Sequence, residues 1–252
     1  MLIKTQIKYL IRTQKLAIII AVSIFIGILA PVLARYQNEL IAWAFATEGI
    51  EIDWGFLSPS IEDGWIQVHS QVLEIYMFIH IFILGSLLNL ENHYRFSETY
   101  WATPINRFKH GGTKIMVGIS LITLGLMIVG AVSSIYLNLF FDGFNWMDLG
   151  YILFPLWLIM VMIYSGMVFI YSVYHRFSLS IISGIALYFV LTLFSGFRGM
   201  FFAYFPSRLT QIGVNYVING ETPNETRFVV LISLLIIVIF WGISFKWWKK
   251  HR

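Results

Sequence analysis

The chain has 252 residues, of which 58% are hydrophobic and only 12% are charged, whereas ordinary soluble domains carry about 25% charged residues. This composition excludes an ordinary water-soluble domain and is typical of an integral membrane protein. The absence of cysteine excludes disulfides, thiolate metal sites and a cysteine nucleophile. The net charge of +4 is small, so the distribution of charges along the chain is more informative than their sum.

The first fifteen residues, MLIKTQIKYLIRTQK, have the pattern of an amphipathic helix. The basic residues share one side of the helical wheel, and apolar residues form a stripe beside them. The basic side consists of Lys4, Lys8, Arg12 and Lys15, and the apolar stripe of Ile3, Ile7, Leu10 and Ile11. A basic amphipathic helix beside a span is typical of a segment that lies on the anionic inner face of a membrane. It would serve either as a simple anchor or as an element with a further role.

Six apolar stretches follow, each near the length of about 20 residues that a helix needs to cross a bilayer. Their apolar runs are continuous rather than alternating, so we expect helices and not strands of a barrel. The predicted spans are 16–34, 71–90, 115–137, 151–173, 179–196 and 228–245. The first also resembles a secretory signal peptide, but we expect it to be retained. The predicted fold is a single all-α transmembrane domain that occupies residues 1–252.

The distribution of Lys and Arg predicts the orientation of the spans, because cytoplasmic loops carry an excess of both residues. If the N-terminus is cytoplasmic, thirteen of the 17 Lys and Arg residues lie on the cytoplasmic side and four on the outer side. We therefore expect both termini in the cytoplasm.

Two long segments are then expected on the outer side. The loop predicted over 35–70 carries six acidic residues and one basic residue. This bias indicates either an acidic vestibule for cationic substrates or, as we favour, only the usual scarcity of Lys and Arg outside. The segment 197–227 begins with an apolar stretch that Pro206 interrupts and that is too short to span a bilayer. This pattern fits a pair of short re-entrant helices before the last span.

Three ionisable residues are expected at membrane depth. Glu74 lies about one turn inside the second predicted span, and Arg198 enters the re-entrant segment at a similar depth. A charge in hydrocarbon costs roughly 2.5–3.5 kcal/mol, so we predict an ion pair between them, acting as a gate or, as we favour, as a structural link. His80 lies near the middle of the same span. We favour a packing role with a partner on a neighbouring helix over a proton-linked or substrate-contacting role on a transport pathway.

The longest polar interval in the middle of the chain is Glu91–Lys114, ENHYRFSETYWATPINRFKHGGTK. Its first half is predicted to form a short helix with Tyr100 and Trp101 as aromatic side chains. Pro104 ends that helix, because proline lacks a donor and disfavours helix in the residue before it. Asn106 suits the N-cap of the next helix. A segment anchored at both ends, with exposed aromatic groups, suits docking into a groove on a soluble partner.

The stretch E-T-Y-W-A-T-P-I-N-R, with a lysine behind it, resembles the first cytoplasmic loop of type-2 ABC exporter permeases. Those loops carry a Glu, a few apolar residues, a Thr-Pro pair, an Arg, and a Lys that leads into the third span. The matching residues are Glu98, Thr103, Pro104, Arg107 and Lys114. Two features depart from the pattern: Phe96-Ser97 replaces the usual Gly-Thr, and Tyr100-Trp101 replaces the usual aliphatic pair.

The resemblance implies that this segment, 91–114, is a coupling loop whose helix docks into a separate ATPase subunit. The implied coupling residues are Glu98, Tyr100, Trp101, Thr103, Pro104, Arg107 and Lys114. The chain would then be the permease subunit of an exporter in a bacterial cell membrane. It would pair with a second copy or a sister permease and with two ATPase copies, which bind ATP and Mg²⁺. The substrate would be a peptide, a drug, a lipid-linked molecule or similar.

The chain contains no G-x-x-x-x-G-K-[ST] phosphate loop, so we expect ATP hydrolysis in the partner, and no cofactor or metal in this chain. An intramembrane enzyme or haem protein is one alternative. However, only His80 lies deep in a span, and neither H-E-x-x-H nor G-x-S-x-G occurs. A second alternative is a non-transporting sensor or resistance (immunity) protein on the same scaffold. Membrane lipids are expected partners in every case, and nucleic acid in none.

Overall fold

The computed structural model describes residues 2–46, 59–89, 107–197 and 200–250, and within these ranges the chain forms helices and no strand. Six helices are long and apolar enough to cross a membrane, which confirms the predicted number of spans and makes this a multi-pass membrane protein. The candidate spans are Lys15–Trp43, Ile61–Leu88, Lys109–Phe140, Trp146–Tyr174, Phe177–Ser195 and Thr226–Trp248. Each overlaps a predicted stretch, and all six are longer than predicted.

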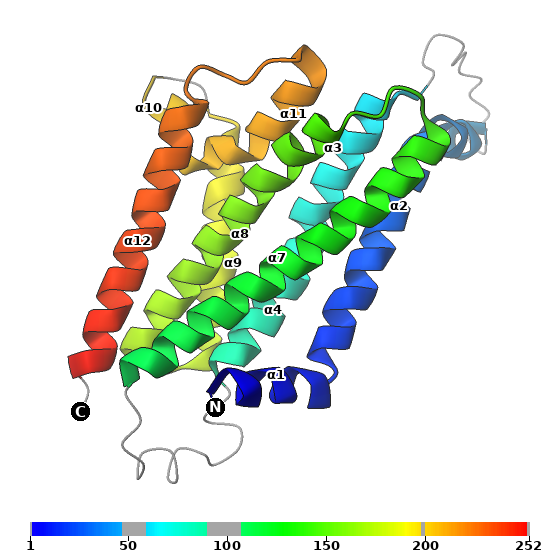
Figure 1. Cartoon of the computed structure of the whole chain (residues 1–252). Helices are drawn as coiled ribbons and strands as arrows, with labels where there is room; N and C mark the ends of the chain where they lie inside the picture. Colours follow the sequence, from blue (N-terminus) through cyan, green and yellow to red (C-terminus); the bar gives the residue numbers. More distant parts are fainter. Residues whose placement is uncertain (1, 47–58, 90–106, 198–199, 251–252) are drawn as a thin grey trace.

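The long helices run side by side as one bundle, and α1 lies across one end of it, here called the α1 end (Figure 1). Both termini lie at the α1 end (Figure 1). The elements are α1 (Leu2–Arg12), α2 (Lys15–Ala46), α3 (Ile61–Gln71), a π-helical segment (Val72–Tyr76), α4 (Met77–Leu88), α7 (Arg107–Phe140), α8 (Trp146–Tyr174), α9 (Phe177–Ser195), α10 (Met200–Ala203), a 3₁₀ turn (Pro206–Arg208), α11 (Leu209–Asn219) and α12 (Thr226–Lys250).

Helix α8 forms the centre of the bundle. In its most apolar window 78% of the residues are buried inside the protein, against 22% for α12. It packs against α7, α9, α11 and α12, while α2 packs against α3 and α7. Because α8 contacts most of the other spans, a displacement of α8 would be felt across the bundle.

The predicted N-terminal helix is present as α1, and a tight turn separates it from the first span. Gln14 in that turn has a φ of 58°, in the left-handed region that often ends a helix. Tyr9 and Leu10 of α1 are buried against the bundle, whereas Ile7 and Ile11 are 45% and 58% exposed. The predicted apolar stripe is therefore divided between the bundle and the surface.

The second span begins ten residues before its predicted start, at Ile61. Ser60 caps this helix: its hydroxyl accepts a hydrogen bond from the Asp63 N–H at 3.3 Å, and the Asp63 carboxylate accepts one from the Ser60 N–H at 2.9 Å. This reciprocal pair is a capping box. The first turns contain polar residues and thus look like a loop, but Trp65 and His69 in these turns are buried inside the bundle.

The predicted bounds of the external loop, 35–70, are wrong at both ends. Helix α2 continues to Ala46, and α3 occupies the last part of the segment, while 47–58 lie outside the described residues. Asp63 completes the capping box of α3, and Glu39 is exposed on α2. An acidic vestibule in this region stays a prediction.

The segment 197–227 contains α10, the 3₁₀ turn and α11, so short helices are present where the sequence predicts them. Arg208 links them to the end of α9. Its guanidinium donates to the carbonyl of Phe197 at 3.0 Å and to the side-chain oxygen of Gln211. The Gln211 amide in turn donates to the carbonyl of Ser195 at 2.7 Å. These bonds satisfy carbonyl groups that the end of a helix leaves without partners.

Candidate functional site

A buried lysine joins the start of α7 to α4 and α8. Lys114 is only 1% exposed, and its ammonium group donates to the carbonyl oxygen of Leu88, at the end of α4, at 2.7 Å. The ammonium also lies 4.8 Å from the ring centroid of Tyr171 in α8. The Lys114 carbonyl accepts a hydrogen bond from the Tyr164 hydroxyl at 2.8 Å. The last carbonyls of a helix lack intrahelical partners, and the helix dipole favours a cation there.

A second lysine supports the same end of α4. Lys15, the first residue of α2, donates to the Ser86 hydroxyl at 2.7 Å and to the Tyr9 hydroxyl, and it lies over the Tyr9 ring. The helical pattern of the first fifteen residues predicts Lys15 on the basic side of the N-terminal helix. That prediction is wrong, because the turn at Gln14 ends α1 and directs Lys15 into the bundle. The lysine pair (Lys15 and Lys114) therefore links α1, α2, α4, α7 and α8.

The lysine pair stands at the base of the predicted coupling segment. Five of the predicted coupling residues, Glu98, Tyr100, Trp101, Thr103 and Pro104, lie outside the described residues. Arg107 is the first residue of α7, directly after the predicted cap Asn106. Lys114 was assigned to the coupling loop, but it lies within α7 and is buried. The helix from Arg107 onward agrees with the predicted cap at Asn106, and Lys114 is buried at the base of the segment. Its role in coupling stays a prediction.

A small polar cluster (Ser23, Tyr76 and His80) lies where α2, the π-helical segment, α4 and α7 meet. The Tyr76 and Ser23 hydroxyls are 2.9 Å apart. Because the Ser23 hydroxyl donates to the Ile19 carbonyl at 2.6 Å, Tyr76 is the donor in that pair. His80 Nδ1 lies 3.3 Å from the Tyr76 carbonyl, and the His80 ring also lies against the backbone of Leu121 in α7. His80 is 1% exposed and does not line the groove described below, and its role on a pathway stays a prediction.

Only one of the two residues of the predicted ion pair in the membrane is described by the structure. Glu74 lies in the π-helical segment with its side chain exposed on the surface of the bundle. Arg198 lies outside the described residues. The pairing, and its interpretation as a gate or a structural link, therefore stay predictions.

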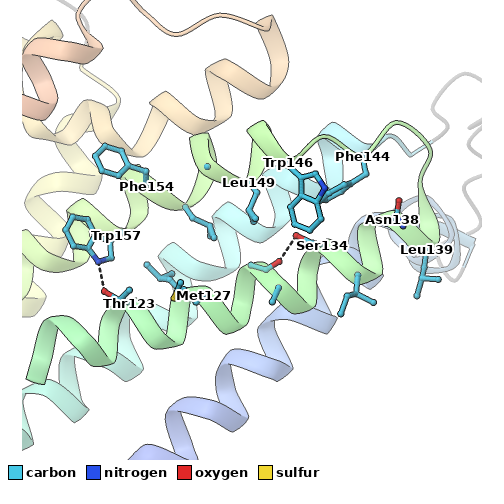
Figure 2. A pocket seen from close by; sticks show the side chains of 16 residues that line it. Thr123, Met127, Ser134, Asn138, Leu139, Phe144, Trp146, Leu149, Phe154 and Trp157 are labelled. Carbon is cyan, nitrogen blue, oxygen red and sulfur yellow. Dashed lines mark hydrogen bonds between the residues drawn. The ribbon is translucent and has the colours of Figure 1, made fainter.

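A groove of about 1410 Å³ runs along the side of the bundle between α7 and α8 (Figure 2). None of its lining residues is charged. Met127 and Leu139 are 66% and 70% exposed, so the groove opens on the surface of the spans. At one end the indole N–H of Trp157 donates to the Thr123 hydroxyl at 2.9 Å and joins the two walls. Asn138 lies toward the other end, as Figure 2 shows.

The packing of glycines explains where the groove closes and where it is hollow. Gly118 of α7 receives the ring of Tyr164, which brings α7 and α8 together near the α1 end. Farther along, Leu153 packs on Gly130 and closes the floor of the groove. A Cβ atom at Gly150, on the opposite wall, would meet nothing within 4 Å. The walls therefore touch along the floor and leave an open space between their rims.

Sequence reasoning missed the partners of the lysine pair, which are Tyr9, Ser86, Leu88, Tyr164 and Tyr171. One signal for them was present in the sequence. A lysine at membrane depth needs polar or aromatic partners, and Tyr164 and Tyr171 are seven residues apart, on one face of the fourth predicted span. The groove had no such signal, because its volume depends on how far two helices diverge.

No protein-family model matches this chain. A comparison with curated protein sequences also finds no match. The resemblance to type-2 ABC exporter permeases is therefore carried by the motif in residues 91–114 together with the arrangement of spans.

Proposed function

We propose that this protein is the transmembrane permease subunit of an ATP-driven exporter. It would move a peptide, a drug, a lipid-linked molecule or a similar substrate out of the cytoplasm or the membrane. ATP hydrolysis would take place in a separate ATPase subunit that docks on the segment between α4 and α7.

The observation that carries the proposal is the buried contact between Lys114 and Leu88. Leu88 lies just before the predicted coupling segment and Lys114 is its last residue, and the Lys114 ammonium donates to the Leu88 carbonyl at 2.7 Å. Through Tyr164 the same contact reaches α8, the most buried span. A force applied to the segment by a docked partner would therefore act on α4, α7 and α8 together, as a coupling element requires.

The excess of Lys and Arg supports a cytoplasmic position for the α1 end. Lys8 and Arg12 are exposed on α1, which suits contact with an anionic inner leaflet. In this orientation α10 and α11 form the outer re-entrant segment. The assembly would contain a second copy or a sister permease and two ATPase subunits, in the cell membrane of a bacterium.

Copurification from native membranes tests the proposal. We expect an ATP-binding subunit to copurify with the tagged wild-type chain. We expect Glu98 to form a buried charge pair in the docked complex, so Glu98→Arg should reduce the yield at least about tenfold, because truncating one partner of such a pair costs on the order of 2–5 kcal/mol. The subunit would be detected by photolabelling with an ATP analogue and by mass spectrometry.

Glu39→Arg is the matched control, since it makes the same charge change at an exposed residue of α2. It should leave the yield of the ATP-binding subunit at the wild-type level. The proposal is wrong if no ATP-binding subunit accompanies the wild-type chain, or if both variants lower the yield equally.

A further inference from the structure

The groove between α7 and α8 is large and apolar. Its volume of about 1410 Å³ exceeds the roughly 300–1,000 Å³ of pockets for drug-sized ligands. Its lining on α7 extends from Thr123 to Leu139, which corresponds to about 24 Å at 1.5 Å per residue. An uncharged groove of this length, open at the side of membrane-spanning helices, excludes a soluble ionic ligand and favours an elongated apolar one.

The two ends of the groove differ in polarity. At the end formed by Trp157 and Thr123, the Trp157 indole N–H already donates a hydrogen bond to the Thr123 hydroxyl. This end therefore offers a ligand only apolar and aromatic surface. At the other end, the Asn138 side chain is exposed and makes no hydrogen bond to the residues that the structure describes. Trp146 beside it is 71% exposed, as is typical of tryptophan at the membrane–water interface. The groove therefore has an apolar body and one polar end.

We propose that this groove binds an acyl-chain lipid drawn from the bilayer. The acyl chains would lie along the floor formed by Leu153 on Gly130, and the headgroup would receive hydrogen bonds from Asn138 and Trp146. The same polarity favours a lipid over a transmembrane helix, because a lipid combines a long apolar body with one polar end. The proposal rests on that part of the proposed function that places the spans in a bilayer, and it does not require the ATPase.

Photolabelling in vesicles tests this site. The purified full-length chain would be placed in vesicles of phosphatidylethanolamine and phosphatidylglycerol that contain a phosphatidylcholine with a diazirine in one acyl chain. We expect adducts on groove residues such as Met127 and Leu153. Ala131→Trp should reduce these adducts roughly tenfold, because an indole at this exposed lining position occupies the space that an acyl chain needs.

Ala186→Trp is the matched control, because Ala186 is exposed on another candidate span, α9, outside the groove. The groove residues of this variant should be photolabelled by the lipid at the wild-type level. Asn138→Leu provides a second variant with no added bulk, and it should lower groove labelling by weakening the hold on the headgroup. Equal labelling of Met127 and Leu153 in all four proteins would overturn the proposal, since the lipid would then be only part of the general lipid shell.

A second copy of the chain is the alternative occupant, and the absence of native cysteine makes it testable. If Ala131→Cys forms a dimer with a short bifunctional thiol reagent, and the wild-type groove takes no lipid label, the proposal is overturned. Copurification of the ATPase is a separate readout. If it fails while the labelling behaves as expected, only the transporter proposal falls.

Discussion

Lys114→Met is expected to lower the free energy of unfolding by about 1.5–3 kcal/mol, the usual contribution of a hydrogen bond to a charged group. Methionine retains most of the length and volume of the lysine stem but has no donor for the Leu88 carbonyl, which Lys114 reaches at 2.7 Å. That carbonyl would be left without this partner at the end of α4. The measurement is a denaturant titration of the purified chain in detergent, monitored by tryptophan fluorescence.

Lys109→Met is the control for this prediction, because Lys109 lies on the same helix with its side chain exposed. Surface substitutions of this kind usually change stability by no more than about 0.5 kcal/mol. If the Lys114 and Lys109 variants unfold at the same denaturant concentration, the buried lysine does not hold α4 to α7. The proposal that a force on the coupling segment acts on α4, α7 and α8 together would then lose its support.

Gly125→Ala is expected to lower the free energy of unfolding by about 1–3 kcal/mol, the range for overpacking a well-packed core. A Cβ atom at this position of α7 would overlap the Tyr76 hydroxyl and would approach His80 Nε2 to 3.3 Å. Tyr76 would have to move and give up its bond to Ser23. Thermal unfolding of the detergent-solubilised chain measures the effect.

The contact at Gly125 also predicts a rescue. Tyr76→Phe removes the oxygen atom that the new Cβ meets, so Gly125→Ala should cost less in the Tyr76→Phe background than alone. Gly242→Ala is the control, since a Cβ atom there would meet nothing within 4 Å. Equal effects at the two glycines, or strictly additive effects of Gly125→Ala and Tyr76→Phe, would contradict the described packing.

The number and type of the spans could be predicted from the sequence, because apolar length alone decides whether a helix can cross a bilayer. The boundaries could not. The second span begins at Ile61 rather than at 71, since polar residues that face the bundle interior look the same in a hydropathy average as residues in water. Lys15 was misplaced for a related reason: the helical wheel continues through the turn at Gln14, but the helix does not.

The candidate site was predicted in part. The sequence singled out Lys114 through its place in a motif, but not its burial or its bond to Leu88. The ligands of a buried lysine come from helices distant in sequence, and a single sequence does not pair them. The groove between α7 and α8 arises where the two helices diverge and where Gly150 has no side chain to fill the space, and neither property has a sequence periodicity.

The central claim is that the segment between α4 and α7 docks on an ATP-binding subunit. It is tested most directly by photo-cross-linking in intact membranes from Trp101 and, as a matched control, from Trp146, each replaced by a photoreactive phenylalanine. Trp146 is 71% exposed at the start of α8, at the end of the bundle opposite α1 (Figure 1). The account predicts an adduct with an ATP-binding subunit from position 101 and none from position 146. No such adduct from position 101, or equal adducts from both positions, would contradict it.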